Sequence, residues 1–105
     1  MNKLAKNKIS KIDAQKLEQL RKKIDLIDHH ILKLIGQRLK IAKKMGTIKI
    51  RNKMPLLQKN RLAHILKERS CFARHKHKIP STFTNKLISL LHQLSLNHQK
   101  QLHKK

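Results

Sequence analysis

The chain has 105 residues, which is the length of a single domain. Two glycines, two prolines and 2% aromatic residues argue against a β-sandwich or β-barrel, whereas abundant Leu, Ile, Lys and Gln favour an all-α fold. The 27 basic residues against 5 acidic ones attract anions in general: nucleic acid, an acidic membrane or a small anionic substrate. Because a drift in composition toward lysine would also raise the charge, charge alone does not identify the partner.

The sequence shows no sign of export or of a membrane anchor. Its first segment, MNKLAKNKIS, lacks the apolar core of a signal peptide, and no apolar run approaches the length of a membrane span. The single cysteine, Cys71, excludes an intrachain disulfide and fits a reducing compartment. We therefore expect a cytoplasmic protein that has no membrane contact.

A long helix is predicted after a basic arm. We expect residues 1–9 to be disordered and residues 10–105 to form one helical domain. Ser10 is a typical N-cap residue with Asp13 three positions later, although Asp13 could itself be the cap. Apolar residues then recur in steps of three and four as an apolar stripe: Leu17, Leu20, Ile24, Ile27, Ile31, Leu34, Ile41, Met45 and Ile48. This pattern predicts a helix over residues 14–50 that packs against partner helices.

Arg38 stands in the apolar stripe where the next apolar residue is due. A guanidinium that is buried without a partner is strongly destabilising, and the upstream acids Asp25 and Asp28 lie too far along the helix to pair with it. One interpretation is a polar residue that fixes the packing register, or an arginine whose tip reaches water. The other is that its counter-ion arrives as an anionic ligand.

A second helix is predicted over residues 56–73. The segment RNKMP, residues 51–55, separates it from the first helix, because proline disfavours the α conformation in the residue before it. One face of the second helix carries Leu62, Ile65, Leu66 and Arg69. We expect the polar segment RHKHKIP, residues 74–80, to form a loop.

A third helix is predicted to begin near Ser81, which is a suitable N-cap. Its apolar face carries Phe83, Leu87, Leu90, Leu91 and Leu94. We expect the final segment, residues 97–105, to fray. The first helix is about twice as long as the other two, so one chain cannot bury the whole apolar stripe, and we expect an intertwined homodimer.

Several polar residues lie beside the predicted apolar faces. Arg21 follows Leu20, Lys49 follows Ile48, Gln58 and Arg61 lie one turn apart, and Ser95 and Gln99 continue the face of Leu91. Each residue taken alone is explained as a solvated polar side chain. Their joint spacing on three helices is the informative signal.

That joint spacing resembles the all-α chorismate mutase family. The resemblance covers residues 17–99 and includes Arg61 twelve positions after Lys49. Its sequence segments are LEQLRKKIDLID, LIGQRLKIAKKMGTIKI and FTNKLISLLHQLSLNHQ. It implies the mutase domain alone, without a fused prephenate-processing enzyme, and a dimer whose two equivalent sites are built from both subunits.

The resemblance also implies an activity and a set of roles. Chorismate, a dicarboxylate, would rearrange to prephenate without a cofactor or a metal, at the branch toward phenylalanine and tyrosine. Arg38, Arg61 and Ser95 would bind the substrate carboxylates, and Arg21 would reach the site of the neighbouring subunit. Lys49 and Gln99 would donate hydrogen bonds to the ether oxygen, as catalytic groups.

The chain departs from the family pattern at two positions. Gln58 replaces an aspartate and Leu62 replaces a glutamate that contact the substrate hydroxyl in typical members. Gln58 can still form a hydrogen bond with that hydroxyl, but Leu62 cannot. Weaker recognition of the hydroxyl is therefore expected, and an inactive relative of the family is an alternative.

The nearest alternative function is isochorismate pyruvate-lyase, which the same fold supports with a similar Arg, Lys and Gln set. The segment IDLID and Gln99 resemble that branch, whereas Ser95 favours the mutase because the lyase pattern has a bulky aromatic residue there.

Two further alternatives come from other classes of protein. A basic nucleic-acid-binding protein would fit the charge, but Phe72 and Phe83 are the only aromatic residues available for base stacking. A metal site is not expected, because the adjacent His29 and His30 diverge on a helix and the histidines of the 74–80 loop lack Cys or acidic neighbours.

Overall fold

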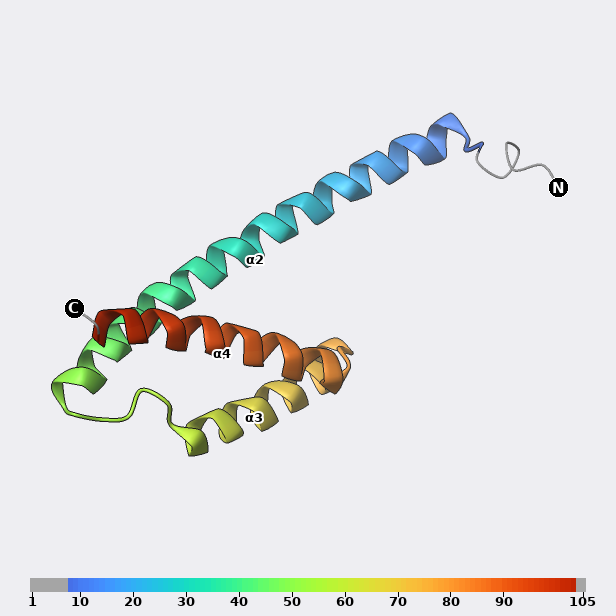
Figure 1. Cartoon of the computed structure of the whole chain (residues 1–105). Helices are drawn as coiled ribbons and strands as arrows, with labels where there is room; N and C mark the ends of the chain where they lie inside the picture. Colours follow the sequence, from blue (N-terminus) through green and yellow to red (C-terminus); the bar gives the residue numbers. More distant parts are fainter. Residues whose placement is uncertain (1–7, 104–105) are drawn as a thin grey trace. The chain divides into compact units, whose positions relative to one another are not determined.

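The computed structural model describes residues 8–103, and over these residues the chain forms three helices and no strand. The helices are α2 (Lys11–Arg51), α3 (Lys59–His77) and α4 (Ser81–His103) (Figure 1). The all-α fold with a long first helix is therefore confirmed. Most of the basic arm predicted over residues 1–9 lies outside the described residues.

Helix α2 starts at Lys11, three residues before the predicted range, and Ser10 rather than Asp13 is its cap. The Ser10 hydroxyl accepts a hydrogen bond from the backbone N–H of Asp13 at 3.1 Å, and the Ser10 carbonyl accepts one from the N–H of Ala14 at 2.9 Å. The first bond satisfies one of the N–H groups that have no partner within the helix, and the second is the first main-chain bond of the helix itself. The carboxylate of Asp13 also lies at the positive end of the helix dipole.

The chain divides into two compact units, with the boundary between Leu34 and Ile35. All described residues of the first unit, 8–34, are exposed, including the residues of the apolar stripe. Leu20, Ile24 and Ile27 are each 55–56% exposed. Within this unit, a single described helix cannot bury such a face.

Helix α2 ends in a Schellman turn. Lys53 adopts the left-handed conformation with φ of 55°, its N–H donates to the Ile50 carbonyl at 3.1 Å, and the N–H of Met54 donates to the Lys49 carbonyl at 2.8 Å. Pro55 follows directly and cannot continue a helix. The break predicted over residues 51–55 is therefore confirmed.

Helix α3 begins at Lys59, three residues later than predicted. Gln58 is extended, with φ of −115° and ψ of 97°, and acts as the N-cap residue. The Leu56 carbonyl accepts a hydrogen bond from Lys49 Nζ at 2.9 Å, which holds this segment against the end of α2. This long-range contact has no signature in the local sequence.

The loop predicted over residues 74–80 is wrong for its first half, because α3 continues to His77. Lysine and arginine are good helix formers, so a run of charges does not by itself end a helix. The helix ends at Lys78, which is left-handed with φ of 57°. The N–H groups of Lys78 and Ile79 both donate to the Ala73 carbonyl before Pro80.

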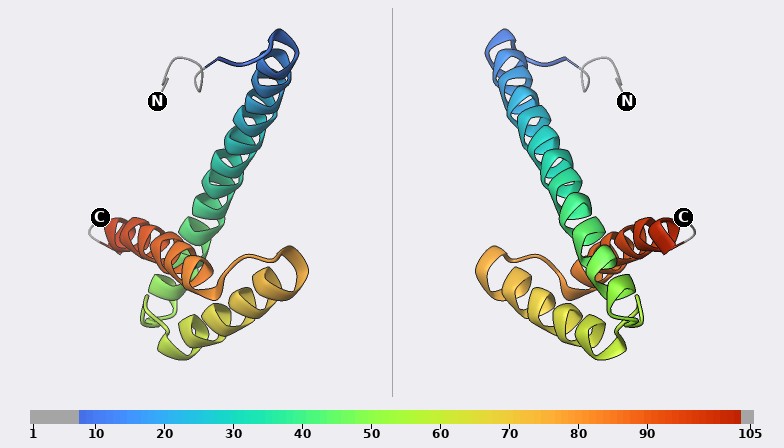
Figure 2. Two further views of the ribbon diagram at one scale, coloured as in Figure 1. Left: turned by 90° about the vertical axis from the view of Figure 1, so that its right-hand side faces the viewer. Right: turned by 90° about the vertical axis from the view of Figure 1, so that its left-hand side faces the viewer.

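Helices α3 and α4 pack against each other in the second unit (Figures 1 and 2). The buried apolar residues are Ala42 from α2, Ile65 and Ala73 from α3, and Leu96 from α4. The expectation that the final segment frays is wrong up to His103, because Gln99 is buried in this unit. None of the described helices is both long and apolar enough to span a bilayer.

Candidate active site

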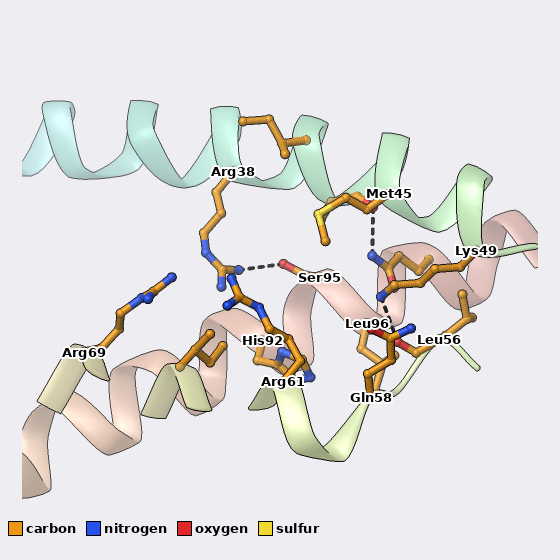
Figure 3. Close-up of a pocket in the computed structure, with 14 residues that line it drawn as sticks. Arg38, Met45, Lys49, Leu56, Gln58, Arg61, Arg69, His92, Ser95 and Leu96 are labelled. Atoms are coloured by element: carbon orange, nitrogen blue, oxygen red, sulfur yellow. Dashed lines mark hydrogen bonds between the residues drawn. The ribbon is translucent and has the colours of Figure 1, made fainter. Parts of the chain in front are cut away.

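A pocket of about 230 Å³ opens within the second unit (Figure 3). The last four turns of α2, the segment before α3, α3 itself and α4 all contribute side chains to it. Six of the seven residues that the sequence analysis selected line this pocket: Arg38, Lys49, Gln58, Arg61, Ser95 and Gln99. Residues from distant parts of the chain are thus brought to one place, which is typical of a ligand site.

Arg38 is fixed by α4. Its Nη1 donates to the Ser95 hydroxyl at 2.8 Å and to the Leu91 carbonyl at 3.2 Å. Both acceptors are neutral, so they orient the guanidinium but do not neutralise it. The Nη2 and Nε hydrogens remain available for a planar anion such as a carboxylate.

The apolar stripe changes its role at Arg38. Downstream of this residue, Ile41 and Met45 line the pocket. Arg38 is therefore the first residue of α2 in the pocket lining, and the stripe residues Ile41 and Met45 follow it. The guanidinium of Arg38 is oriented by α4, and the residue stays partly exposed.

Lys49 and Gln99 form a second polar group at the other end of the pocket. Lys49 Nζ donates to Gln99 Oε1 at 3.2 Å and to the Leu56 carbonyl at 2.9 Å, while Gln99 Nε2 donates to the Ala42 carbonyl at 2.8 Å. An ammonium group has three hydrogens and an amide nitrogen has two. Each group therefore keeps one N–H for a ligand.

Gly46 allows Gln99 to lie this close to α2. A Cβ atom at position 46 would stand 2.7 Å from Gln99 Cγ and 3.1 Å from Gln99 Cβ. Gln99 is only 4% exposed, so its side chain has little room to move. The sequence analysis did not identify Gly46, because nothing in the local pattern distinguishes it from Gly36.

Gln58 and Arg61 line the pocket from the start of α3. The Gln58 side chain makes no capping hydrogen bond, so its amide is free to contact a ligand. Leu62, which stands where the family pattern has an acid, is half-buried and does not line this pocket. Arg21, the seventh selected residue, is exposed in the first unit.

Sequence reasoning missed two pocket residues with ionisable side chains, Arg69 and His92. Arg69 lies one turn after Ile65 on the apolar face of α3, and His92 lies three residues before Ser95 on α4. The helical period therefore contained a signal for both. Both residues border leucines and isoleucines that the same period assigns to packing, so the local pattern alone does not mark them as ligand-binding residues.

The pocket is strongly cationic. Every described ionisable residue that lines it is Arg, Lys or His, without a carboxylate or a cysteine. Burial lowers the pKa of Arg38, and the nearby Arg69 and Arg61 lower it further. Burial also lowers the pKa of Lys49, and burial followed by the charges of Arg38 and Lys49 lowers the pKa of His92.

These features define what the pocket can bind and what chemistry it can support. It offers fixed N–H donors and positive charge to an anionic ligand, without a carboxylate for general-base work or a thiol for covalent attack. Among the described residues, no group of three His, Cys, Asp or Glu side chains lies together as a metal site would require. A site of this kind is suited to orienting a ligand and stabilising developing negative charge.

Comparisons with known proteins point to the same chemistry. Residues 20–100 match the family model described as "Chorismate mutase type II". Over 42 residues the chain is 45% identical to the "Bifunctional chorismate mutase/prephenate dehydratase" of Aquifex aeolicus (strain VF5), a match that covers 40% of this chain and 12% of that relative. No solved structure matches significantly. Because the family model spans all the pocket-lining residues, the chain belongs to the chorismate mutase type II family.

Proposed function

We propose that the protein is a chorismate mutase, which rearranges chorismate to prephenate at the branch step toward phenylalanine and tyrosine. The observation that carries the proposal is the meeting of Arg38, Arg61, Lys49 and Gln99 in one pocket. In class the enzyme is an intramolecular transferase among the isomerases. We infer that it acts in the cytoplasm, in keeping with its single cysteine.

The arginine end of the pocket binds the substrate carboxylates in this proposal. Arg38 is oriented by Ser95 and Leu91, and its free N–H groups form a fork that matches a carboxylate. Arg61 supplies a second guanidinium from α3. Holding both carboxylates keeps the substrate in the compact conformation from which the rearrangement proceeds.

The lysine end stabilises the charge that develops during the reaction. The rearrangement breaks a C–O bond and forms a C–C bond within one molecule, and negative charge accumulates on the ether oxygen. The remaining N–H groups of Lys49 and Gln99 donate to that oxygen. The rearrangement itself needs no proton transfer.

We further infer that the protein is a homodimer that assembles through the apolar stripe of α2. This proposal is supported by the exposed apolar face of residues 8–34, which would face water in a monomer. Arg21 then enters the site of the neighbouring subunit and contacts a substrate carboxylate. Gln58, whose amide is free, contacts the substrate hydroxyl.

The test is to add the purified protein to chorismate and to identify the product by NMR. Prephenate formed faster than in the uncatalysed reaction supports the proposal, and the Lys49→Ala variant should lose most of that acceleration. If a folded wild-type protein leaves chorismate unchanged, the proposal is wrong. Formation of salicylate from isochorismate by the same sample would then identify a lyase.

A further inference from the structure

Three guanidinium groups gather at one end of the pocket. Arg38 comes from α2, and Arg61 and Arg69 come from α3. In Figure 3 the side chains of Arg38 and Arg69 extend toward each other from facing helices. They are close enough for the charges of Arg69 and Arg61 to lower the pKa of Arg38.

Among the described residues, no acidic side chain lines this end of the pocket. The partners of Arg38 are a hydroxyl and a carbonyl oxygen, and none of the described pocket-lining residues is acidic. Like charges that face one another in a partly buried site repel, because water screens them less there than at the open surface. An anion with more than one negative charge would relieve this repulsion.

Arg69 has only a weak partner in the free protein. Its Nη1 contacts the carboxylate of the adjacent Glu68, and the two side chains are 40% and 46% exposed. Exposed ion pairs of this kind contribute little to stability. Arg69 can therefore exchange Glu68 for a ligand carboxylate at small cost.

We propose that Arg69 is a substrate-binding residue, which shares a ligand carboxylate with Arg38 and makes the pocket selective for dianions over monoanions. This inference rests on the proposed function for the identity of the ligand. One chain then supplies three guanidinium groups to the two carboxylates of the ligand, and any arginine of the partner subunit would add to these three. Arg69 contributes to binding in the ground state and the transition state alike, so its loss should raise KM more than it lowers kcat.

The test compares Arg69→Gln with Arg74→Gln. Arg74 is exposed on the same helix and does not line the pocket, so both variants lose one positive charge and only one loses the proposed contact. Isothermal titration calorimetry measures the binding of prephenate, a dicarboxylate, and of phenylpyruvate, a monocarboxylate. Steady-state kinetics with chorismate separates KM from kcat.

We expect Arg69→Gln to weaken prephenate binding and to raise KM by about tenfold to a hundredfold, as for the loss of one charged hydrogen bond. Phenylpyruvate, which has one carboxylate, should lose less affinity than prephenate does, and kcat should change less than threefold, which is about the effect of an ordinary surface substitution. Arg69→Lys should recover part of the affinity. If Arg69→Gln and Arg74→Gln bind prephenate equally, Arg69 is a solvated surface charge and the inference is wrong.

A second variant keeps the test decisive if Arg69→Gln does not fold. Glu68→Gln removes the competing carboxylate and leaves Arg69 in place, so prephenate should bind more tightly than to wild type. Unchanged or weaker binding by this variant would contradict the inference.

The two proposals fail in different ways. A wild-type protein that binds prephenate through Arg69 but does not convert chorismate refutes the proposed function alone. Conversion of chorismate with equal prephenate affinity in Arg69→Gln and Arg74→Gln refutes the role of Arg69 alone.

Discussion

At the scale of single residues, the pocket depends on the absence of a side chain at position 46. Gly46→Ala gains helix propensity, but the new methyl group meets Gln99 at 2.7 Å and must displace a buried amide. We expect a net loss of about 1 kcal/mol in the free energy of unfolding. Chorismate turnover should fall at least tenfold, which is roughly the effect of misplacing the hydrogen bond that Gln99 donates to the substrate. Turnover and urea denaturation are measured on the same samples.

Gly36→Ala is the matched control for this change. No atom lies within 4 Å of a Cβ at position 36, so the same substitution adds helix propensity without a clash. It should raise the free energy of unfolding by about 1 kcal/mol and preserve turnover. Equal turnover in the two variants would show that the position of Gln99 does not matter for activity.

Arg38→Ala separates binding from folding. The substitution removes a partly buried cation that Arg69 and Arg61 repel, so the melting temperature should stay the same or rise. Turnover (kcat/KM) should fall about a hundredfold to ten-thousandfold, because two charged hydrogen bonds to the substrate are lost. Arg51→Ala, at an exposed position of the same helix, should leave turnover intact. A fully active Arg38→Ala variant would refute the role of Arg38 as a carboxylate ligand.

His92 should make stability depend on pH. Burial and the charges of Arg38 and Lys49 lower its pKa below the ordinary histidine value of 6.5, and Arg61 and Arg69 of α3 line the same pocket. The unfolded chain therefore binds a proton more readily than the folded one. The contribution of His92 to stability is present above pH 6.5 and is lost as the pH falls toward the lowered pKa.

Urea denaturation at several pH values checks this prediction. His92→Gln should flatten the fall in unfolding free energy below pH 6.5, whereas His98→Gln, at an exposed position of the same helix, should retain it. Parallel pH profiles for wild type and both variants would mean that His92 is not the group responsible.

At the scale of elements, local chemistry predicted the helix ends well where a cap or a proline defines them. Ser10 and Pro55 are examples. The start of α3 was predicted three residues too early, because Leu56 is held outside the helix by Lys49, seven residues away. The predicted end of α3 is too early, because a run of basic residues does not by itself end a helix.

The end of α3 offers a test at this scale. Lys78 is left-handed, a conformation that disfavours any residue with a Cβ, so Lys78→Gly should raise the free energy of unfolding by about 0.5–1 kcal/mol. Lys76→Gly, inside the helix, should lower it by about 1 kcal/mol. Thermal denaturation of both variants is the measurement. Destabilisation by Lys78→Gly would mean that the left-handed turn does not end α3 in solution.

At the scale of the whole molecule, the apolar stripe predicts assembly. Light scattering coupled to gel filtration should give twice the chain mass of 12.4 kDa for the wild type. Ile27→Lys places a charge on the apolar face and should give a monomer, whereas Gln19→Lys adds the same charge off the stripe and should remain dimeric. A monomeric wild type would refute the proposed dimer.

The sequence predicted the class of fold and six residues of the pocket, because helical periodicity and polar spacing are local signals. It did not predict the close approach of Gly46 to Gln99 or the third guanidinium, Arg69. Both depend on how α2, α3 and α4 meet, and that geometry is fixed by packing between distant segments.

Because the pocket lining is cationic, the stability of the folded protein should also depend on the concentration of its anionic ligand. An anion that binds only the folded state multiplies the ratio of folded to unfolded chains by 1 + [L]/Kd, where [L] is the free ligand concentration. Proteases act mainly on chains that have opened, so resistance to digestion should rise with the concentration of a dicarboxylate ligand. The steady-state abundance of this protein in a cell would then rise with the concentration of its dicarboxylate ligand.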